Sequence, residues 1–102
     1  MSAGRGGTMS ERVGLAERIA AAVTALPDVA GLTAGPHGRV VTYRVGAPYA
    51  GVAVREREVE VGVVARRGRP LAEIAEAVRA AALPLAGDLP VDVLIADITE
   101  TG

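Results

Sequence analysis

The chain has 102 residues, which is the size of one domain. Hydrophobic residues make up 50% and charged residues 23% of it, a balance too apolar for a disordered chain, and the net charge of −1 argues against a general nucleic-acid binder. The sequence has no cysteine, no lysine and a single histidine, which excludes disulfides, thiolate or multi-histidine metal sites within the chain, and Schiff-base chemistry.

The hydrophobic residues are small. Alanine and valine dominate, phenylalanine and tryptophan are absent, and there are two tyrosines. Apolar burial contributes about 25 cal/mol per Å², and aromatic side chains usually supply the largest areas. We therefore expect a core of modest stability that a subunit interface would support, and a net charge near zero opposes such self-association only weakly.

The N-terminal stretch 1–8 is glycine-rich and polar, which predicts a disordered leader without the apolar segment of a signal peptide. No uncharged apolar run approaches the roughly 18 residues that span a bilayer. We therefore expect a soluble, cytoplasmic chain that reaches the inner face of a membrane only peripherally, through a partner. A single domain is expected over 9–98 and a frayed tail over 99–102.

A first helix is predicted over 9–25. Thr8 and Glu11 have the spacing of a capping box, in which each side chain satisfies a backbone donor of the first turn. Pro27 ends the helix because the residue before a proline avoids the α region. One apolar stripe recurs at helical spacing and comprises Val13, Ala16, Ile19, Ala20, Val23 and Leu26.

The middle of the chain predicts a loop over 28–38 followed by strands. Alternating apolar and polar residues, typical of half-buried strands, occur over 39–45, 51–55 and 58–66. The connections, 46–49 and 55–58, have turn composition.

A second helix is predicted over 70–83, with Pro70 at its first position and Pro84 ending it. A last strand follows over 91–98. The order α-β-β-β-α-β predicts an α+β two-layer sandwich, with two helices on one face of a mixed four-stranded sheet. The last strand should join parallel to 58–66 through a right-handed crossover.

Two helices cover one sheet face, so the other is expected to be open. The period of two assigns Val41, Tyr43, Val45, Val52, Val54, Val59, Val61, Val63, Val91, Val93 and Ile95 to the helix side. The open side then carries Val40, Thr42, Arg44, Glu58, Glu60, Gly62, Val64, Asp92, Leu94, Ala96 and Ile98. Within it, an apolar patch of Val64, Leu94, Ala96 and Ile98 is predicted as a partner interface, the alternative being burial within the monomer or scattered residues.

Arg66, Arg67 and Arg69 form a basic cluster before the second helix. A helix N-terminus favours anions, so this turn is a candidate contact for a phosphate, a lipid headgroup or an acidic partner. The alternative is a solvated strand-to-helix turn, because surface arginines need no ligand.

Catalytic and metal-binding signals are weak. His37 lies in a Gly-Pro-His-Gly turn without an evident nucleophile or orienting carboxylate, and a solvated loop histidine is the simpler interpretation. The same turn matches the bare Gly-x-x-Gly of KH-type RNA clamps, although such a loop joins two helices. Glu58, Glu60 and Asp92 are candidates to share a face and bind a divalent cation, but nearby arginines are the simpler partners. No cofactor, small-molecule substrate or enzymatic activity is predicted.

Several stretches resemble the alkaline shock protein family of Gram-positive bacteria, in the short form found in high-GC actinobacteria. They cover Gly51 to Leu71, Ile74 to Ala81 and Pro90 to Ile98, together with Ile19 to Val23, Leu26 to Leu32 and Val41 to Tyr43. The resemblance extends over about 10–98, and its motifs are structural patterns.

This resemblance implies a non-enzymatic interaction or scaffold protein of cell-envelope stress or homeostasis. Such a protein would act as a homo-oligomer or through a membrane-anchored protein partner. The chain lacks the long charged tails of larger members, which puts filament-like assembly in doubt. The competing hypothesis is a small KH-like nucleic-acid-binding domain.

Overall fold

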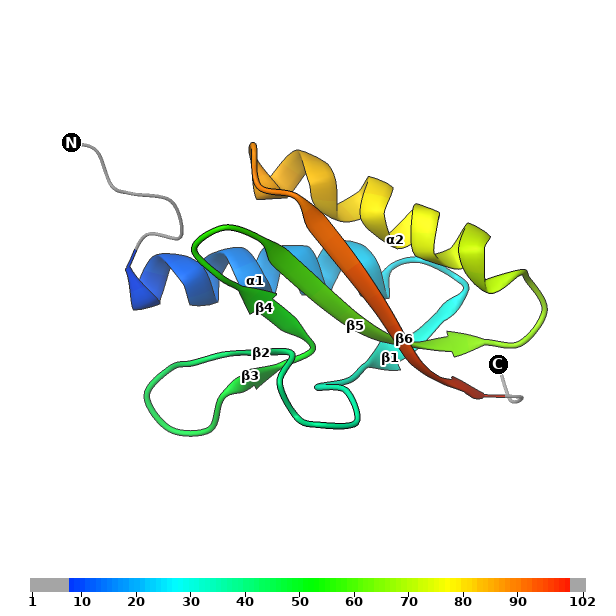
Figure 1. Ribbon diagram of the computed structural model, residues 1–102, viewed down its shortest axis with the longest axis horizontal. Helices are drawn as coiled ribbons and strands as arrows, with labels where there is room; N and C mark the ends of the chain where they lie inside the picture. Colours follow the sequence, from blue (N-terminus) through cyan, green and yellow to red (C-terminus); the bar gives the residue numbers. More distant parts are fainter. Residues whose placement is uncertain (1–7, 100–102) are drawn as a thin grey trace.

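The computed structural model describes residues 8–99, in which two helices lie on one face of a four-stranded sheet beside a two-stranded hairpin (Figure 1). The fold is of the α+β class, as predicted. Most of the predicted leader and tail lies outside the described residues. The elements in chain order are α1 (Met9–Thr24), β1 (Val29–Leu32), β2 (Val41–Thr42), β3 (Tyr49–Ala50), β4 (Val52–Val54), β5 (Val59–Arg66), α2 (Leu71–Ala86) and β6 (Val91–Thr99).

Strand β5 is the centre of the sheet. One of its edges pairs in parallel with β6 along its whole length, from Val59 opposite Val91 to Arg66 opposite Thr99. The other edge is shared, because β4 pairs antiparallel with the first half of β5 and β1 with the second half. The parallel pairing through the α2 crossover confirms the prediction for the last strand.

Helix α1 begins where the capping box places it. The Thr8 hydroxyl accepts a hydrogen bond from the Glu11 N–H at 3.1 Å, and the Glu11 carboxylate accepts one from the Thr8 N–H at 2.9 Å. The helix buries four residues of the predicted stripe, Ala16, Ile19, Ala20 and Val23, while Val13 is half-buried and Leu26 follows the helix end. The local sequence thus determines both the start of this helix and its buried face.

Helix α2 is longer than predicted. Pro70 is its N-cap and not its first residue, and Pro84 lies inside the helix, which ends at Ala86. Proline lacks the N–H that would complete one helical hydrogen bond. Two further residues stay helical because Ala86 continues the buried stripe of Val78 and Ala82 against the core. Packing therefore outweighs the proline signal here.

The predicted loop over 28–38 contains a strand. Val29–Leu32 has no clear alternation, yet it forms β1 by pairing with Val63, Val64 and Ala65 of β5. The sequence signal is weak because a glycine interrupts the segment and because its partner lies far along the chain. This strand, and not 39–45, is the fourth member of the main sheet.

The predicted strand 39–45 was wrong in extent and in the faces assigned. Val41–Thr42 forms β2, which pairs with the unpredicted β3 in a separate small sheet. Tyr43 and Val45, predicted to face the helices, are 72% and 93% exposed. Val40 and Thr42, predicted on the open face, are buried. The chain leaves the sheet here, so a period of two no longer reports on burial.

The sheet face opposite the helices is partly covered by the loop that joins β1 to β2. A Cβ built on Gly62 would lie 2.3 Å from the carbonyl oxygen of Thr33, and one on Gly35 would lie 2.9 Å from Leu94 Cδ2. The Thr33 N–H also donates to the Gly62 carbonyl at 2.9 Å. The expectation of a fully open face was therefore wrong near Gly62 and Leu94, because this loop packs on it.

A bulge in β6 changes the face of its last residues. Val63 pairs with Ile95 but Val64 pairs with Asp97, so Ala96 is an extra residue on β6. Ile98 consequently lies opposite Ala65, a residue of the helix side, and not beside Leu94. A bulge moves every later side chain to the other face, which the sequence pattern does not signal.

Candidate functional site

The predicted interface patch is divided by the structure. Val64 and Leu94 share the face opposite the helices, and both are half-buried. Ala96 is exposed at the bulge, and Ile98 is 42% exposed on the helix side. Two of the four residues therefore share a face, while the other two lie along the same strand at and beyond the bulge.

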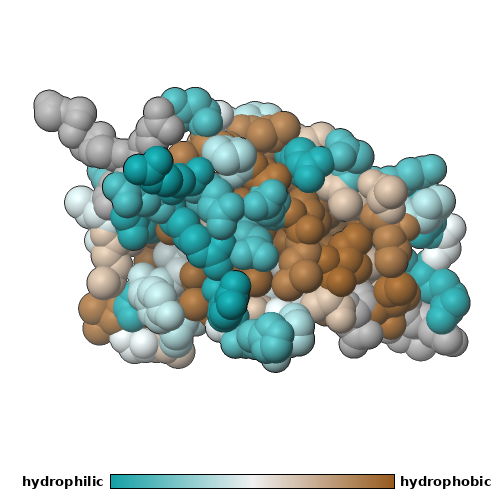
Figure 2. All heavy atoms as spheres, in the orientation of Figure 1, coloured by the Kyte–Doolittle hydropathy of each residue, from teal (hydrophilic) through white to brown (hydrophobic). Residues whose placement is uncertain are grey.

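The exposed apolar surface nevertheless gathers along β6. Figure 2 shows hydrophobic residues over the middle of β6 and the adjoining part of α2, and hydrophilic residues toward the β4–β5 turn. Val93, Leu94 and Ile95 are all only half-buried, and Leu71 at the start of α2 is 42% exposed. Rimmed apolar areas of this kind often mark contacts with other proteins. The margin of the sheet formed by β6 is hereafter called the β6 margin.

The arginines of the β5–α2 turn make contacts within the chain. Arg66 Nε donates to the Pro27 carbonyl at 2.9 Å, and Arg69 Nε forms an ion pair with Asp28 at 3.0 Å. Arg67 is exposed and also has an interaction partner. These contacts attach the turn to the connection between α1 and β1, which favours the structural interpretation. The predicted anion contact of Arg66, Arg67 and Arg69 stays a prediction.

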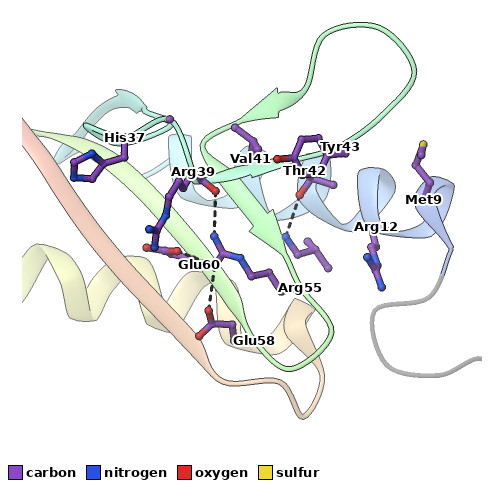
Figure 3. Close-up of a pocket in the computed structure, with 12 residues that line it drawn as sticks. Met9, Arg12, His37, Arg39, Val41, Thr42, Tyr43, Arg55, Glu58 and Glu60 are labelled. Carbon is purple, nitrogen blue, oxygen red and sulfur yellow. Dashed lines mark hydrogen bonds and ion pairs between the residues drawn. The ribbon is translucent and has the colours of Figure 1, made fainter.

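A second candidate site is an open cleft of about 880 Å³ between the first turn of α1, the β2 segment and the β4–β5 turn (Figure 3). Arg12, Arg39 and Arg55 line it together with His37 and the exposed Tyr43. The cleft thus holds three arginines and two carboxylates, those of Glu58 and Glu60. The cleft therefore has a modest excess of positive charge beside an aromatic ring.

Arg55 is the centre of this cleft and is already paired. Its Nη1 lies 3.1 Å from Glu58 and 2.8 Å from Glu60, and its Nη2 donates to the Arg39 carbonyl at 3.1 Å. The expected pairing of these glutamates with a nearby arginine is thus confirmed. No group of three potential metal ligands occurs among the side chains that the structure describes.

His37 lies on the surface of the loop between β1 and β2. Its turn is closed by a hydrogen bond from the Gly38 N–H to the Gly35 carbonyl at 3.1 Å, and both glycines have positive φ. The Gly-x-x-Gly turn therefore joins two strands, whereas the RNA clamp it matches joins two helices. His37 is exposed at the margin of the cleft, and in Figure 3 its ring points away from Arg55.

Sequence reasoning did not find the cleft or the role of Thr42. Arg12, Arg39 and Arg55 come from three separate elements, so no spacing in the sequence signals their proximity. The Thr42 hydroxyl donates to the Val52 carbonyl at 2.7 Å and accepts from the Val54 N–H at 3.0 Å. Both bonds satisfy outward backbone groups of β4. A single threonine in the sequence does not show that its hydroxyl will reach a strand ten or more residues away.

Comparisons with protein-family models, with curated proteins and with solved structures give no match. Within the described range, neither helix has the length and apolar character needed to cross a bilayer.

Proposed function

We propose that this protein is a non-enzymatic interaction module of the alkaline shock type, acting in the cytoplasm in cell-envelope stress or homeostasis. It would associate with itself or dock on a membrane-anchored protein at the inner face of the membrane. The sequence resemblance suggests the family, and the β6 margin is the observation that carries an interaction function. No catalytic step is assigned to any residue.

The β6 margin supports this function because its apolar side chains lie at the border of the sheet. Val93 and Ile95 pack against the core yet stay half-buried, and Ala96 is exposed beside them. A core of valine and alanine in a small domain also gains from further apolar burial at an interface. Contact with a partner protein would supply that burial.

The test is affinity capture from detergent-solubilised membranes of the native host, with mass spectrometry of the retained proteins. The wild-type chain should retain a membrane protein, and Ala96→Glu should lose it, because the new carboxylate lies at the exposed bulge of the β6 margin. Ala80→Glu is the matched control, since Ala80 is also exposed but lies on α2. Retention of nothing by the wild-type chain overturns docking, and equal retention by Ala96→Glu overturns the assignment to the β6 margin.

The second candidate is a nucleic-acid-binding domain, and the arginine-lined cleft is the observation that favours it. Arginines neutralise phosphates, and an exposed tyrosine offers a stacking surface for a base. A filter-binding titration with single-stranded RNA at two salt concentrations tests it. Tight, salt-sensitive binding that Arg39→Ala and Tyr43→Ala weaken would replace the interaction module as the preferred function, whereas micromolar or weaker binding in physiological salt would discard the candidate.

A further inference from the structure

The outer edge of β6 carries backbone groups to which the described part of the chain offers no partner. The Val59 N–H donates to the Pro90 carbonyl, and the register pairs Val59 with Val91 in parallel. In a parallel ladder the bonding residues of β6 therefore alternate, so Pro90, Asp92 and Leu94 face β5. The N–H and C=O groups of Val91, Val93 and Ile95 point away from the sheet.

This outer edge is closed at both ends and open in the middle. Arg79 Nε donates to the Val91 carbonyl at 3.1 Å, and the bulge at Ala96 interrupts the strand after Ile95. Between these points, no hydrogen bond within residues 8–99 reaches the outward groups of Val93 and Ile95. Two donors and two acceptors thus lie in a row of three uncharged residues.

At the opposite edge of the sheet, the outward backbone groups have hydrogen-bond partners. There, the Thr42 hydroxyl satisfies the outward Val52 carbonyl and Val54 N–H of β4. Natural sheets protect exposed edges with charges, prolines, bulges or covering segments, because a bare edge pairs with other chains. The bulge at Ala96 and the Arg79 contact protect only the two ends of the β6 edge, and the valine, leucine and isoleucine between them carry none of these devices.

We propose that two copies of this chain pair antiparallel through their β6 edges, with the two-fold axis beside Leu94. In that register Val93 of each copy pairs with Ile95 of the other. Both outward N–H groups and both carbonyls of each copy then form hydrogen bonds across the axis, and Leu94 lies opposite Leu94. This inference rests on the self-association mode of the proposed function, and it assigns the β6 edge to a second copy of the chain and not to a membrane-anchored protein.

The register follows from which groups are free and from the charges nearby. A pairing centred on Val93 would place Ile95 opposite Val91, whose carbonyl is already held by Arg79. A pairing centred on Ile95 would place Val93 opposite residue 97, beyond the bulge. Centring on Leu94 uses all four outward groups of Val93 and Ile95, and it sets Asp92 of one copy across from the neutral Ala96 of the other. The net charge of −1 adds little repulsion between copies.

The hydrogen bonds are tested by removing one donor per copy without disturbing the β5–β6 ladder. Ile95→Pro lacks the outward N–H, which β5 does not use, and proline is tolerated at such edge positions. Ile95→Ala is the matched control because it shortens the side chain but keeps the N–H. In sedimentation equilibrium we expect dimers for the wild-type and Ile95→Ala chains, and dimerisation weakened about a hundredfold for Ile95→Pro, as the loss of two hydrogen bonds implies. Circular dichroism checks that both variants fold.

The register is tested separately by cross-linking, for which a chain without cysteine is well suited. Leu94→Cys places two thiols directly opposite each other, within the Cα separation that a disulfide accepts. Asp92→Cys is the out-of-register control, since its two copies would lie about 13 Å apart. Mild oxidation should convert Leu94→Cys to a covalent dimer at least tenfold faster than Asp92→Cys.

Three results would overturn the pairing. They are a wild-type chain that stays monomeric up to about 1 mM, dimers that persist in Ile95→Pro, and equal cross-linking of the two cysteine variants. A β6 edge occupied instead by an extended segment of another protein would give the first result. The membrane-protein capture is a separate measurement, so a monomeric chain that still retains a membrane protein refutes the pairing and leaves the proposed function standing.

Discussion

Thr42 closes the outer edge of β4 by accepting a hydrogen bond from the backbone N–H of Val54 at 3.0 Å. Its hydroxyl also donates to the Val52 carbonyl at 2.7 Å, and the residue is only 3% exposed. Two backbone groups of the core strand therefore depend on one side chain. The hydroxyl does here what a neighbouring strand does elsewhere in a sheet, and it also holds the β2–β3 hairpin against the domain.

We expect Thr42→Val to lower the free energy of unfolding by about 2–4 kcal/mol, because the shape is kept while two buried backbone groups lose their partner. Urea denaturation followed by circular dichroism measures this. Thr24→Val is the control, since the Thr24 hydroxyl bonds only to carbonyls of its own helix and the residue is exposed. A loss no larger for Thr42→Val than for Thr24→Val would contradict the role assigned to this hydroxyl.

Gly62 is required by the close approach of the β1–β2 loop. A Cβ at this position would lie 2.3 Å from the Thr33 carbonyl oxygen, a backbone atom that cannot rotate away. We expect Gly62→Ala to destabilise the protein by about 1–3 kcal/mol, as overpacking does. Gly31→Ala, in the adjacent strand, meets nothing within 4 Å and should be neutral or slightly stabilising. Thermal unfolding of both variants compares them, and equal melting temperatures would contradict this packing.

The capping box at Thr8 makes a local contribution to stability. Its two reciprocal hydrogen bonds satisfy backbone donors of the first turn of α1, so Thr8→Ala should cost about 1 kcal/mol. Ser10→Ala, two residues later and equally exposed, is the control and should change stability by less than about 0.5 kcal/mol. Hydrogen exchange of the first amides of α1 should accelerate in Thr8→Ala alone, and unchanged protection there would argue against the cap.

What the sequence predicts well is what neighbouring residues determine. The capping box, the buried stripe of α1, the strand 59–66 and its parallel partner all follow from short-range patterns and the handedness of the crossover. The errors arise where distant segments decide. Val29–Leu32 becomes a strand because β5 offers it an edge, Pro84 stays helical because Ala86 is buried, and Ile98 changes face because of one extra residue in β6.

The candidate site shows the same division. The pattern of β6 placed Leu94 on the face opposite the helices, since alternation reports on the faces of a strand, but Leu94 is half-buried there. It could not show that Arg79 covers the Val91 carbonyl or that a loop packs on Leu94, because both contacts join elements distant in sequence. The cleft arginines were missed for the same reason.

Arg55 holds the cleft side of the sheet together through Glu58, Glu60 and the Arg39 carbonyl. Its side chain is 35% exposed, so water and salt weaken these ion pairs, and Arg55→Met should cost only about 1 kcal/mol. The loss should shrink as sodium chloride is raised from 50 mM to about 1 M, because screening removes the same interactions from the wild-type chain. Arg57→Met, in the same turn but fully on the surface, serves as control and should change stability by less than about 0.5 kcal/mol at either salt concentration. A cost for Arg55→Met that is independent of salt would show that the arginine stabilises the turn through its hydrogen bond to the Arg39 carbonyl and the packing of its stem, and not through the two glutamates.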